Sequence, residues 1–410
     1  MENNNSATPK NVWLIILVAS LGYFVDIYDL VIFSIVRVQS FADIGISEAE
    51  MRTKGEYVIN MQMAGLLIGG LIWGIIGDKY GRLKVLFGSI LLYSLGNIAN
   101  GFVQDIHSYA IIRFIAGIGL AGELGAGITL VSESMGKNKR GYGTMIVAGI
   151  GVLGAAAAFF VAQHFNWRNA YFVGGGMGLL LLLMRVGLVE SGMFKKAEDT
   201  AGVVKGKFSM LFATKERGMR YVYCLLIGLP LWFVVGILIT QAPEFGKILG
   251  GTEKLSAGRG IMLAYIGLSL GEIVAGFIAQ MTKSRRLAVA IFQVLSLISV
   301  FCYLSCKGIT PLQFSYLAFA MGFSVGYWAS FVTIASEQFG TNLRATVTTT
   351  APNFVRGALI PSTLLFEYFA GHFGIITSAY IMIILLVAVA LFAISQLKES
   401  FSKDLNFVEE

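Results

Sequence analysis

Charge is the property that this sequence has least of. Only 13% of its 410 residues are Asp, Glu, Lys or Arg, whereas 56% are hydrophobic and the mean hydropathy is +0.73. Soluble domains carry about 25% charged residues, because charge covers a surface that faces water. The shortage excludes a soluble globular enzyme, a disordered chain and a nucleic-acid-binding protein. It favours an all-α protein embedded in a lipid bilayer, since a membrane β-barrel would show short alternating segments instead.

Cysteine and histidine are also rare, with three residues of each. Cys224, Cys302 and Cys306 lie in apolar segments without the spacing of metal ligands, so we expect buried thiols, no disulfide framework and no metal. The sequence also lacks a His-Glu-x-x-His motif, a nucleophile elbow and a P-loop. We therefore expect neither an enzyme nor an ATP-driven pump, and no cofactor.

Long apolar runs predict twelve membrane-spanning helices, because about 20 apolar residues cross the hydrocarbon core as a helix. The predicted spans are residues 12–37, 55–77, 83–103, 108–132, 142–163, 169–189, 219–241, 259–281, 287–306, 312–335, 346–369 and 373–397. The first apolar run lacks a small-residue cleavage site, which predicts a retained span. A polar stretch divides the chain into an N-terminal bundle (1–189), a cytoplasmic central loop (190–218) and a C-terminal bundle (219–410).

The positive charges predict the orientation of these spans. If the N-terminus is inside, the inner segments hold 20 of the 31 Lys and Arg residues, the outer segments hold 8 and the spans hold 3. Short cytoplasmic loops carry an excess of Lys and Arg, so both termini are expected in the cytoplasm of a cell (inner) membrane protein. This distribution explains the net charge of +7 without a nucleic-acid partner.

Two stretches of the chain repeat at an offset of 204 residues. Residues 132–140 read S-E-S-M-G-K-N-K-R and residues 336–344 read S-E-Q-F-G-T-N-L-R, with five identities in nine positions. Both six-span halves begin on the inner side, so the pattern predicts two parallel repeats around a central site that opens alternately to each side. The charged residues that the repeats share are Glu133, Arg140, Glu337 and Arg344.

Residues 74–84 read G-I-I-G-D-K-Y-G-R-L-K. This stretch resembles the signature cytoplasmic loop of the major facilitator superfamily, which implies twelve helices in two halves and transport by alternating access. Its glycines allow close helix packing, and its acid and arginine can pair with neighbouring helix ends to hold an inner gate closed. The predicted inner-gate residues are Gly74, Gly77, Asp78, Gly81 and Arg82, together with the four charged residues of the repeat.

A narrower resemblance rests on short motifs. Asp26-Ile27-Tyr28-Asp29 resembles the D-x-[FY]-D motif of aromatic-acid/proton and related organic-acid/proton symporters. Residues 113–119 (R-F-I-A-G-I-G) and the Gly122-Glu123 pair that follows are similar to segments of the same branch. The fifth predicted span lacks the Gly-Pro pair typical of drug/proton antiporters. The resemblance implies uptake of an organic anion together with protons.

Four acids within the spans are the candidates for proton coupling: Asp26, Asp29, Glu123 and Glu272. An ionisable group at the bilayer centre costs about 2.5–3.5 kcal/mol or more, so each requires a function or a partner. Asp26 and Asp29 are three residues apart and are expected on one face of a helix. The alternative is a structural pair with a basic residue such as Arg113.

Arg356 is predicted in the middle of the span 346–369, where its side chain cannot reach the surface. A guanidinium stays charged and binds a carboxylate through two hydrogen bonds, so we expect it to bind an anionic substrate. The alternative is an internal pair with Glu272, Asp29 or Glu123. For Arg113, outward snorkelling and pairing with Asp29 stay open.

Aromatic residues in the predicted central spans could stack on a substrate or simply fill space between helices. The full predicted binding set is Arg356, Arg113, Tyr28, Asn353, Tyr327 and Trp328. The leading hypothesis is a monomeric secondary transporter that moves a small organic anion with protons. A carrier or exporter of a neutral or cationic solute, such as a sugar or drug, is the alternative, and the sequence does not distinguish H⁺ from Na⁺.

Overall fold

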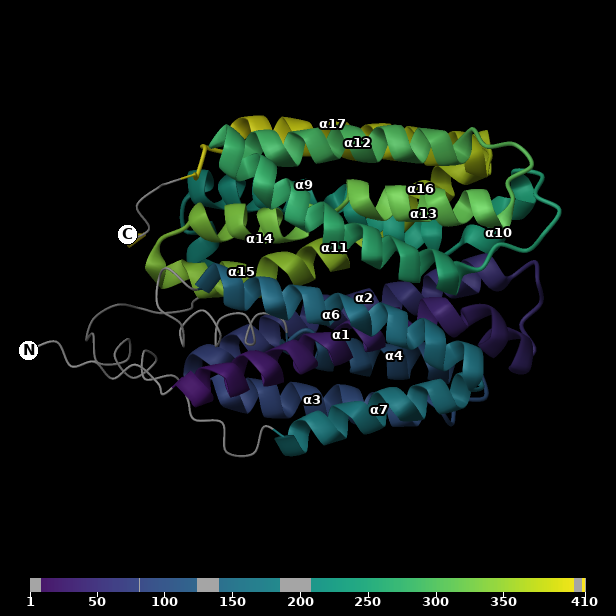
Figure 1. Ribbon diagram of the computed structural model, residues 1–410, viewed down its shortest axis with the longest axis horizontal. Helices are drawn as coiled ribbons and strands as arrows, with labels where there is room; N and C mark the ends of the chain where they lie inside the picture. The colour runs from purple at the N-terminus through teal and green to yellow at the C-terminus, as the bar shows by residue number, and fades with distance from the viewer. Residues whose placement is uncertain (1–8, 81, 124–139, 185–207, 402–407, 410) are drawn as a thin grey trace, which may run out of the picture.

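The computed structural model describes residues 9–80, 82–123, 140–184, 208–401 and 408–409, and every regular element in them is a helix. The helices run along one common direction in two bundles that lie side by side (Figure 1). The first bundle, the N half, contains α1 (Pro9–Asp43), α2 (Met51–Tyr80), α3 (Arg82–Asn100), α4 (Ile106–Leu120), α6 (Arg140–His164) and α7 (Trp167–Met184).

The second bundle, the C half, follows residue 207. It contains η1 (Phe208–Phe212), α9 (Lys215–Phe233), η2 (Val234–Ile239), α10 (Ala242–Ile248), α11 (Ala257–Thr282), α12 (Arg285–Leu304), α13 (Pro311–Ser324), α14 (Trp328–Glu337), α15 (Thr341–Gly357), α16 (Leu359–Phe373) and α17 (Ile375–Gln396). Described helices coincide with all twelve predicted spans, although parts of the spans 108–132 and 169–189 lie outside the described residues. The boundaries of the central loop stay a prediction.

Three predicted spans of the C half are broken into two helical pieces. Pro230 lies inside α9, which continues into the π-helix η2, and Gly326 lies between α13 and α14. Pro352 lies inside α15, which ends one turn later beside Ala358. Proline removes a backbone donor and bends a helix, and such breaks at membrane depth occur where the freed groups face protein or a cavity. The breaks in α9–η2 and α15–α16 flank the interface with the N half.

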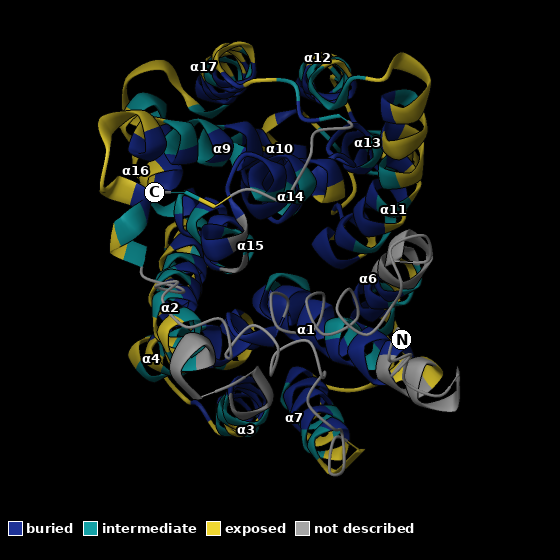
Figure 2. Ribbon diagram, turned by 90° about the vertical axis from the view of Figure 1, so that its left-hand side faces the viewer, coloured by how far each residue is buried: buried dark blue, intermediate teal, exposed yellow. Residues whose placement is uncertain are grey.

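Exposed residues lie at the perimeter of the two bundles, whereas buried residues concentrate toward the middle (Figure 2). Many of the exposed residues are large and apolar. Leu183 and Tyr316 are each 70% exposed, and Phe277 is 64% exposed. A soluble protein rarely exposes so many large apolar groups. Seven described helices, counting broken ones as one, are long and apolar enough to cross a membrane, and three shorter ones are apolar. The perimeter is therefore the surface that faces lipid.

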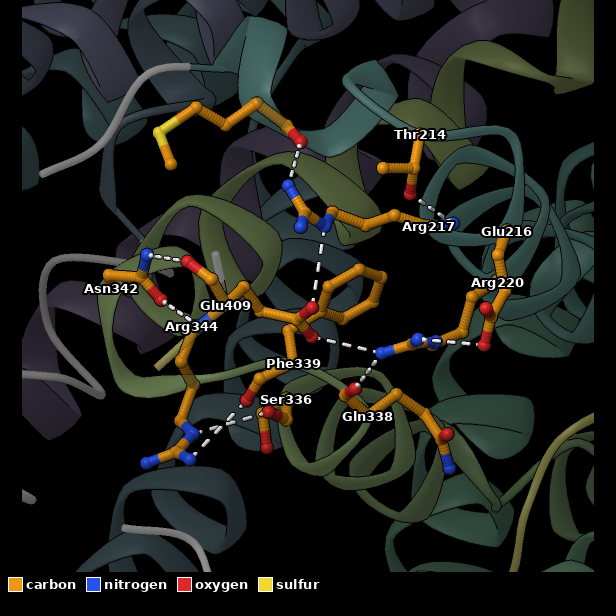
Figure 3. A network of polar contacts seen from close by, with 11 residues as sticks. Thr214, Glu216, Arg217, Arg220, Ser336, Gln338, Phe339, Asn342, Arg344 and Glu409 are labelled. Atoms are coloured by element: carbon orange, nitrogen blue, oxygen red, sulfur yellow. Dashed lines mark hydrogen bonds and ion pairs between the residues drawn. The ribbon is translucent and has the colours of Figure 1, made fainter. Parts of the chain in front are cut away.

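We call the end at which α1 begins and α17 ends the inner end, since the sequence predicts it in the cytoplasm, and the opposite end the outer end. At the inner end of the C half, the Glu409 carboxylate contacts Arg217 Nε at 3.3 Å and Arg220 Nη1 at 2.9 Å (Figure 3). The Asn342 amide donates to the Glu409 carbonyl at 2.9 Å and accepts from its N–H at 3.0 Å. This network fastens the last described residues to α9 and to the α14–α15 connection.

Glycines hold equivalent helix pairs together in both halves. A Cβ on Gly117 of α4 would collide with the Gln62 carbonyl of α2, and a Cβ on Gly267 of α11 would collide with the Phe319 carbonyl of α13. Association of helices in lipid depends on close packing rather than on a hydrophobic drive, so residues without a side chain are needed at such contacts. The second and fourth spans of each half are thus joined backbone to backbone.

We predict that Gly267→Ala lowers the stability of the protein by about 1–3 kcal/mol, because the new methyl group forces α11 and α13 apart. Gly276→Ala is the matched control, since Gly276 lies on the same helix with no described atom within 4 Å of an added Cβ. Thermal unfolding in detergent measures both variants. Equal melting temperatures for the two variants would contradict this role of the glycine contact.

Candidate functional site

Three arginines are almost completely buried in the described structure. Arg37 and Arg356 are 1% exposed and Arg113 is fully buried. A guanidinium carries five N–H donors, and a buried donor without an acceptor costs about 1–3 kcal/mol. How completely each arginine is bonded therefore separates a structural role from a site that awaits a ligand.

Arg37 is the most extensively bonded of the three arginines, with only its Nε lacking an acceptor among the described residues, and it joins the two halves at the outer end. Its Nη1 and Nη2 contact the two carboxylate oxygens of Glu244 in α10 at 2.7 and 2.8 Å. The same atoms donate to the carbonyls of Met51 at 2.8 Å and Thr240 at 3.3 Å. The sequence marked Arg37 only as one of the outer cations, because nothing local to it reveals a partner more than 200 residues away.

Arg113 of α4 is turned into the N half. Its Nη1 donates to the backbone carbonyl of Asp29 at 3.2 Å, its Nη2 donates to Asn97 Oδ1, and its guanidinium lies 5.0 Å from the ring centre of Tyr171. Of the two alternatives for Arg113, the structure shows contact with Asp29 rather than snorkelling. The fully buried Asp29 carboxylate accepts no hydrogen bond and lies against Gly174 of α7.

Arg356, in the last turn of α15, is the least satisfied of the three. Its one hydrogen bond to the described residues runs from Nη1 to Asn353 Oδ1 at 3.4 Å, and its buried Nε has no acceptor. The guanidinium lies 5.8 Å from the ring centre of Trp232 and 6.0 Å from that of Trp328. The faces of aromatic rings attract a cation electrostatically, but they do not replace the oxygen acceptors that the N–H groups of a guanidinium need.

Asp26 of α1 faces Arg356 across the interface between the halves. Asp26 Oδ2 is 4.0 Å from Arg356 Nη2, and neither oxygen of this 1%-exposed carboxylate accepts a hydrogen bond. The sequence proposed Glu272, Asp29 or Glu123 as internal partners of Arg356, and the structure corrects this to Asp26. It also separates the two aspartates, since Asp26 faces the C half while Asp29 faces α4 and α7.

Glu123 and Asn353 lie close to this ion pair. Glu123 is 1% exposed, follows the end of α4, and is near enough to Asp26 to interact electrostatically. The Asn353 amide donates to the Ala121 carbonyl of the N half at 3.0 Å, while its oxygen accepts from Arg356. Asn353 therefore connects the buried arginine of one half to the end of α4 in the other.

Glu272 of α11 is half-buried and has a different neighbour. Its carboxylate faces the backbone N–H of Ala329, in the first turn of α14. The break at Gly326 leaves the N–H groups of that turn without intrahelical partners, and a carboxylate at a helix N-terminus compensates them. The break in the predicted span 312–335 thus gives Glu272 a structural partner, and its role in proton coupling stays a prediction.

The aromatic candidates divide into packing residues and site residues. Tyr28 and Tyr327 are fully buried, and their hydroxyls donate to the carbonyls of Ala170 at 2.7 Å and Ile227 at 3.2 Å. Trp328 instead contacts Arg356 and packs edge-on against Trp232, with ring centres 6.2 Å apart. We expect Tyr28 and Tyr327 to position helices and Trp328 to line the site.

A cavity of about 20 Å³ lies between the halves on the outer side of this group, large enough for about one water molecule. It is lined from α1, α2, α9–η2 and α11, with Gln62, Trp232 and Tyr265 among the contributors. The buried Nε1 donor of Trp232 has no acceptor. Sequence reasoning gives Trp232 no role beyond that of an aromatic residue in a predicted central span, and it misses Tyr265. No motif marks either residue, and only the fold brings them to Arg356.

The predicted inner-gate residues are only partly described. Arg285 Nε and Nη2 contact Glu337 at 2.8 Å, and Arg344 donates to the carbonyls of Ser336 at 3.2 Å and Phe339 at 3.3 Å. These contacts fasten the inner ends of α12, α14 and α15 to one another. Gly74 has no described atom within 4 Å of an added Cβ. The remaining predicted residues lie outside the part of the chain whose side chains are described: Gly77, Asp78, Gly81, Arg82, Glu133 and Arg140.

Comparison with known proteins decides the family. The family model described as "Major Facilitator Superfamily" matches residues 13–358, which is most of the chain. The chain belongs to the major facilitator superfamily. This membership confirms the predicted fold of twelve helices in two parallel six-helix repeats, and it makes the protein a multi-pass membrane transporter rather than an enzyme.

Individual superfamily members resemble the chain over most of its length. The putative niacin/nicotinamide transporter NiaP of Bacillus subtilis is 24% identical over 382 residues, covering 90% of this chain and 92% of that protein. The cis,cis-muconate transport protein of Acinetobacter baylyi is 26% identical, covering 91% and 92%. The xylose transporter XylE from Escherichia coli, in a partially occluded inward-open conformation, superposes with a TM-score of 0.68 at 19% identity, covering 97% and 100%, and shares the fold.

We predict that Tyr28→Phe lowers the stability of the transporter by about 1 kcal/mol, since it removes the buried hydrogen bond to Ala170. Substrate KM should not change, because the hydroxyl is committed to α7. Tyr57→Phe, at a residue that is 37% exposed, is the control. Thermal unfolding and initial uptake rates test this pair, and an unchanged melting temperature with a raised KM would assign the hydroxyl to substrate instead.

Proposed function

We propose that this superfamily member is a secondary active transporter that carries a small organic anion together with protons by alternating access. The observation that carries this proposal is the buried, under-bonded guanidinium of Arg356 at the interface of the two halves. An ionisable group at this depth requires a partner or a ligand, and the described residues supply only a distant partner.

A carboxylate is the ligand that fits the unused donors. It would accept two hydrogen bonds from Arg356 in the geometry that a guanidinium prefers. The unpaired Nε1 of Trp232 lies beside the same guanidinium and offers a further donor. The indole rings of Trp232 and Trp328 supply flat apolar surfaces for the rest of a small planar acid.

The Asp26–Arg356 pair links the anion to a proton. The two charged groups lie 4.0 Å apart with no bridging hydrogen bond, so an arriving carboxylate competes with Asp26 for the guanidinium. Once the substrate pairs with Arg356, Asp26 has lost its counter-charge, and proton uptake restores neutrality in the closed cavity. Glu123 interacts electrostatically with Asp26 and is our second candidate for proton coupling at this pair, while Asp29 lies beside Arg113 within the N half.

The names of the relatives support a carboxylate substrate. The Acinetobacter protein is named for cis,cis-muconate and the Bacillus protein for niacin and nicotinamide; muconate and niacin are small carboxylic acids, and nicotinamide is the neutral amide of niacin. At 24–26% identity, these names support a class of ligand rather than a particular compound. We place the transporter in the cell (inner) membrane, with both termini in the cytoplasm, because most of its cations lie at the predicted inner end. We propose that it acts as a monomer.

The second candidate function is transport of a neutral or cationic solute, and the internal Asp26–Arg356 contact is the observation that favours it. In that case the pair would stay closed and the acids would face the solute. A thermal-shift screen of the purified protein separates the two candidates, since carboxylates should raise the melting temperature under the leading proposal. Stabilisation by sugars or amines alone would favour the second.

We predict that Arg356→Ala lowers kcat/KM for uptake by about 100-fold or more, since loss of a buried charged partner costs about 3–5 kcal/mol. Arg356→Lys should recover part of the activity, because an ammonium keeps the charge but not the two-point geometry. Arg259→Ala, at an exposed outer arginine, is the control with the same charge change. Wild-type uptake by a well-expressed Arg356→Ala protein would exclude the anion site.

We predict that Asp29→Asn abolishes accumulation of substrate against its gradient while exchange between internal and external substrate continues. The change removes a titrating group beside Arg113 but keeps its size. Proteoliposomes with an imposed pH gradient measure both activities. Wild-type uptake should increase as the external medium is acidified, and a variant with the same pH dependence would show that Asp29 does not handle the coupled proton.

A further inference from the structure

A second group of charged residues joins the two halves at the outer end, more than a helical turn away from the site around Arg356. Glu56 and Arg52 lie near the start of α2 in the N half, and Glu367 lies near the end of α16 in the C half. Gln241, which precedes α10, completes the group. The hydrogen bond from Thr363 to Asn60, at 3.3 Å, lies next to it between the same two helices. We call Arg52, Glu56, Gln241 and Glu367 the outer cluster.

The outer cluster is tightly bonded around Glu56, which is only 6% exposed. Gln241 Nε2 donates to Glu56 Oε1 at 2.6 Å, and Arg52 Nη1 lies 3.4 Å from the same oxygen. Arg52 Nη1 also donates to Glu367 Oε1, so the carboxylates of Glu56 and Glu367 meet at the same arginine nitrogen and lie close together. One arginine therefore serves two acids, and these acids come from different halves.

Among the described residues, Arg52 is the one cation that forms an ion pair with either acid, and Lys54 on the same helix pairs with neither. Arg37 and Glu244, the nearest other charges on α1 and α10, are bonded to each other through both pairs of atoms. His107 of α4 contacts the ring of Tyr57, with ring centres 6.3 Å apart, and so lies on another side of α2. The buried Oε1 of Gln241 has no donor, although its Nε2 bonds to Glu56. The two acids and one arginine of the outer cluster thus leave it short of one positive charge, and the two carboxyl groups have no hydrogen between them.

A bound proton supplies both the missing positive charge and the missing hydrogen. Two carboxyl groups that share one arginine in a buried site do not ionise together readily, because their like charges repel and one cation offsets only one of them. We propose that the outer cluster is a proton-binding site that takes up one proton from the external medium when the halves close at this end. The proton is shared by Glu56 and Glu367 while the outer end is closed, and it leaves to the same medium when α2 and α16 separate.

This proton differs from the one that the proposed function couples to substrate. It returns to the side from which it came, so it sets the balance between the outer-closed and outer-open states without crossing the membrane. Because the closed state holds one more proton, an acidic external medium favours closure and an alkaline one favours opening. One exchanged proton changes that equilibrium by at most about tenfold for each pH unit.

Labelling of a cysteine below the outer cluster tests this proposal. Ser34→Cys places a thiol on the wall of the cavity between the halves, in a protein that also carries Cys302→Ser and Cys306→Ser. A membrane-impermeant maleimide added outside right-side-out vesicles reaches this thiol only when the outer end opens. The thiolate is the reacting form, so the labelling rate at each pH is divided by that of the same thiol in the detergent-unfolded protein. We expect this normalised rate to rise several-fold between external pH 5.5 and pH 8, with the internal pH held constant.

Glu367→Gln should abolish most of this rise, because an amide donates to Glu56 at every pH and keeps the outer end closed. Glu56→Gln is the second variant, and melting temperatures confirm that each protein is folded. Glu50→Gln is the control, since Glu50 is an exposed acid bonded to Ser47 within its own half. A parent protein without the pH-dependent rise, or a rise that survives in both cluster variants, would overturn the proposal.

Discussion

The constraint on which this structure depends is that a lipid bilayer offers nothing to solvate a charge. Every ionisable side chain within the spans must find its partner in the protein, and the fold meets this demand unequally. Arg37 has a carboxylate and two carbonyls, Arg113 has an amide and a carbonyl, and Arg356 has one amide oxygen at 3.4 Å. The first closes the outer end, the second fixes the interior of one half, and the third is left with donors to offer. The same chemical group therefore has three roles, and its hydrogen bonds decide which.

Sequence reasoning predicted the parts of the fold that depend on composition and local pattern. The twelve spans, the two parallel halves and the family followed from apolar runs, from the repeat at an offset of 204 residues and from the motif at residues 74–84. The breaks in three spans of the C half were not predicted, because Pro230 and Pro352 have no single conformational consequence in lipid. A proline can bend a membrane helix or be accommodated within it, and the packing around it decides.

The site was predicted as a set of residues but not as an arrangement. Asp26, Glu123, Asn353 and Arg356 were named from the sequence, and the structure brings all four together. Which of these charged residues pair with one another could not be predicted from the sequence. A spacing of three residues places Asp26 and Asp29 on similar sides of α1, yet this helix is enclosed by other helices, so a rotation of about 60° is enough to give them different neighbours. Which acid meets Arg356 depends on how the two halves dock, and a single sequence contains no record of that docking.

Alternating access adds an energetic condition to this picture. The contacts that hold the outer end closed include a buried ion pair between Arg37 and Glu244, and separating such a pair without replacement costs about 3–5 kcal/mol. A transporter must nevertheless visit both states, so their free energies have to lie within a few kcal/mol of each other. Contacts that form only when the inner end closes must therefore offset those lost at the outer end. The motif at residues 74–84, with an acid in the last turn of α2 and an arginine at the start of α3, has the chemistry for this. Opposing charged contacts at the two ends leave substrate and protons at the centre enough influence to decide which end is open.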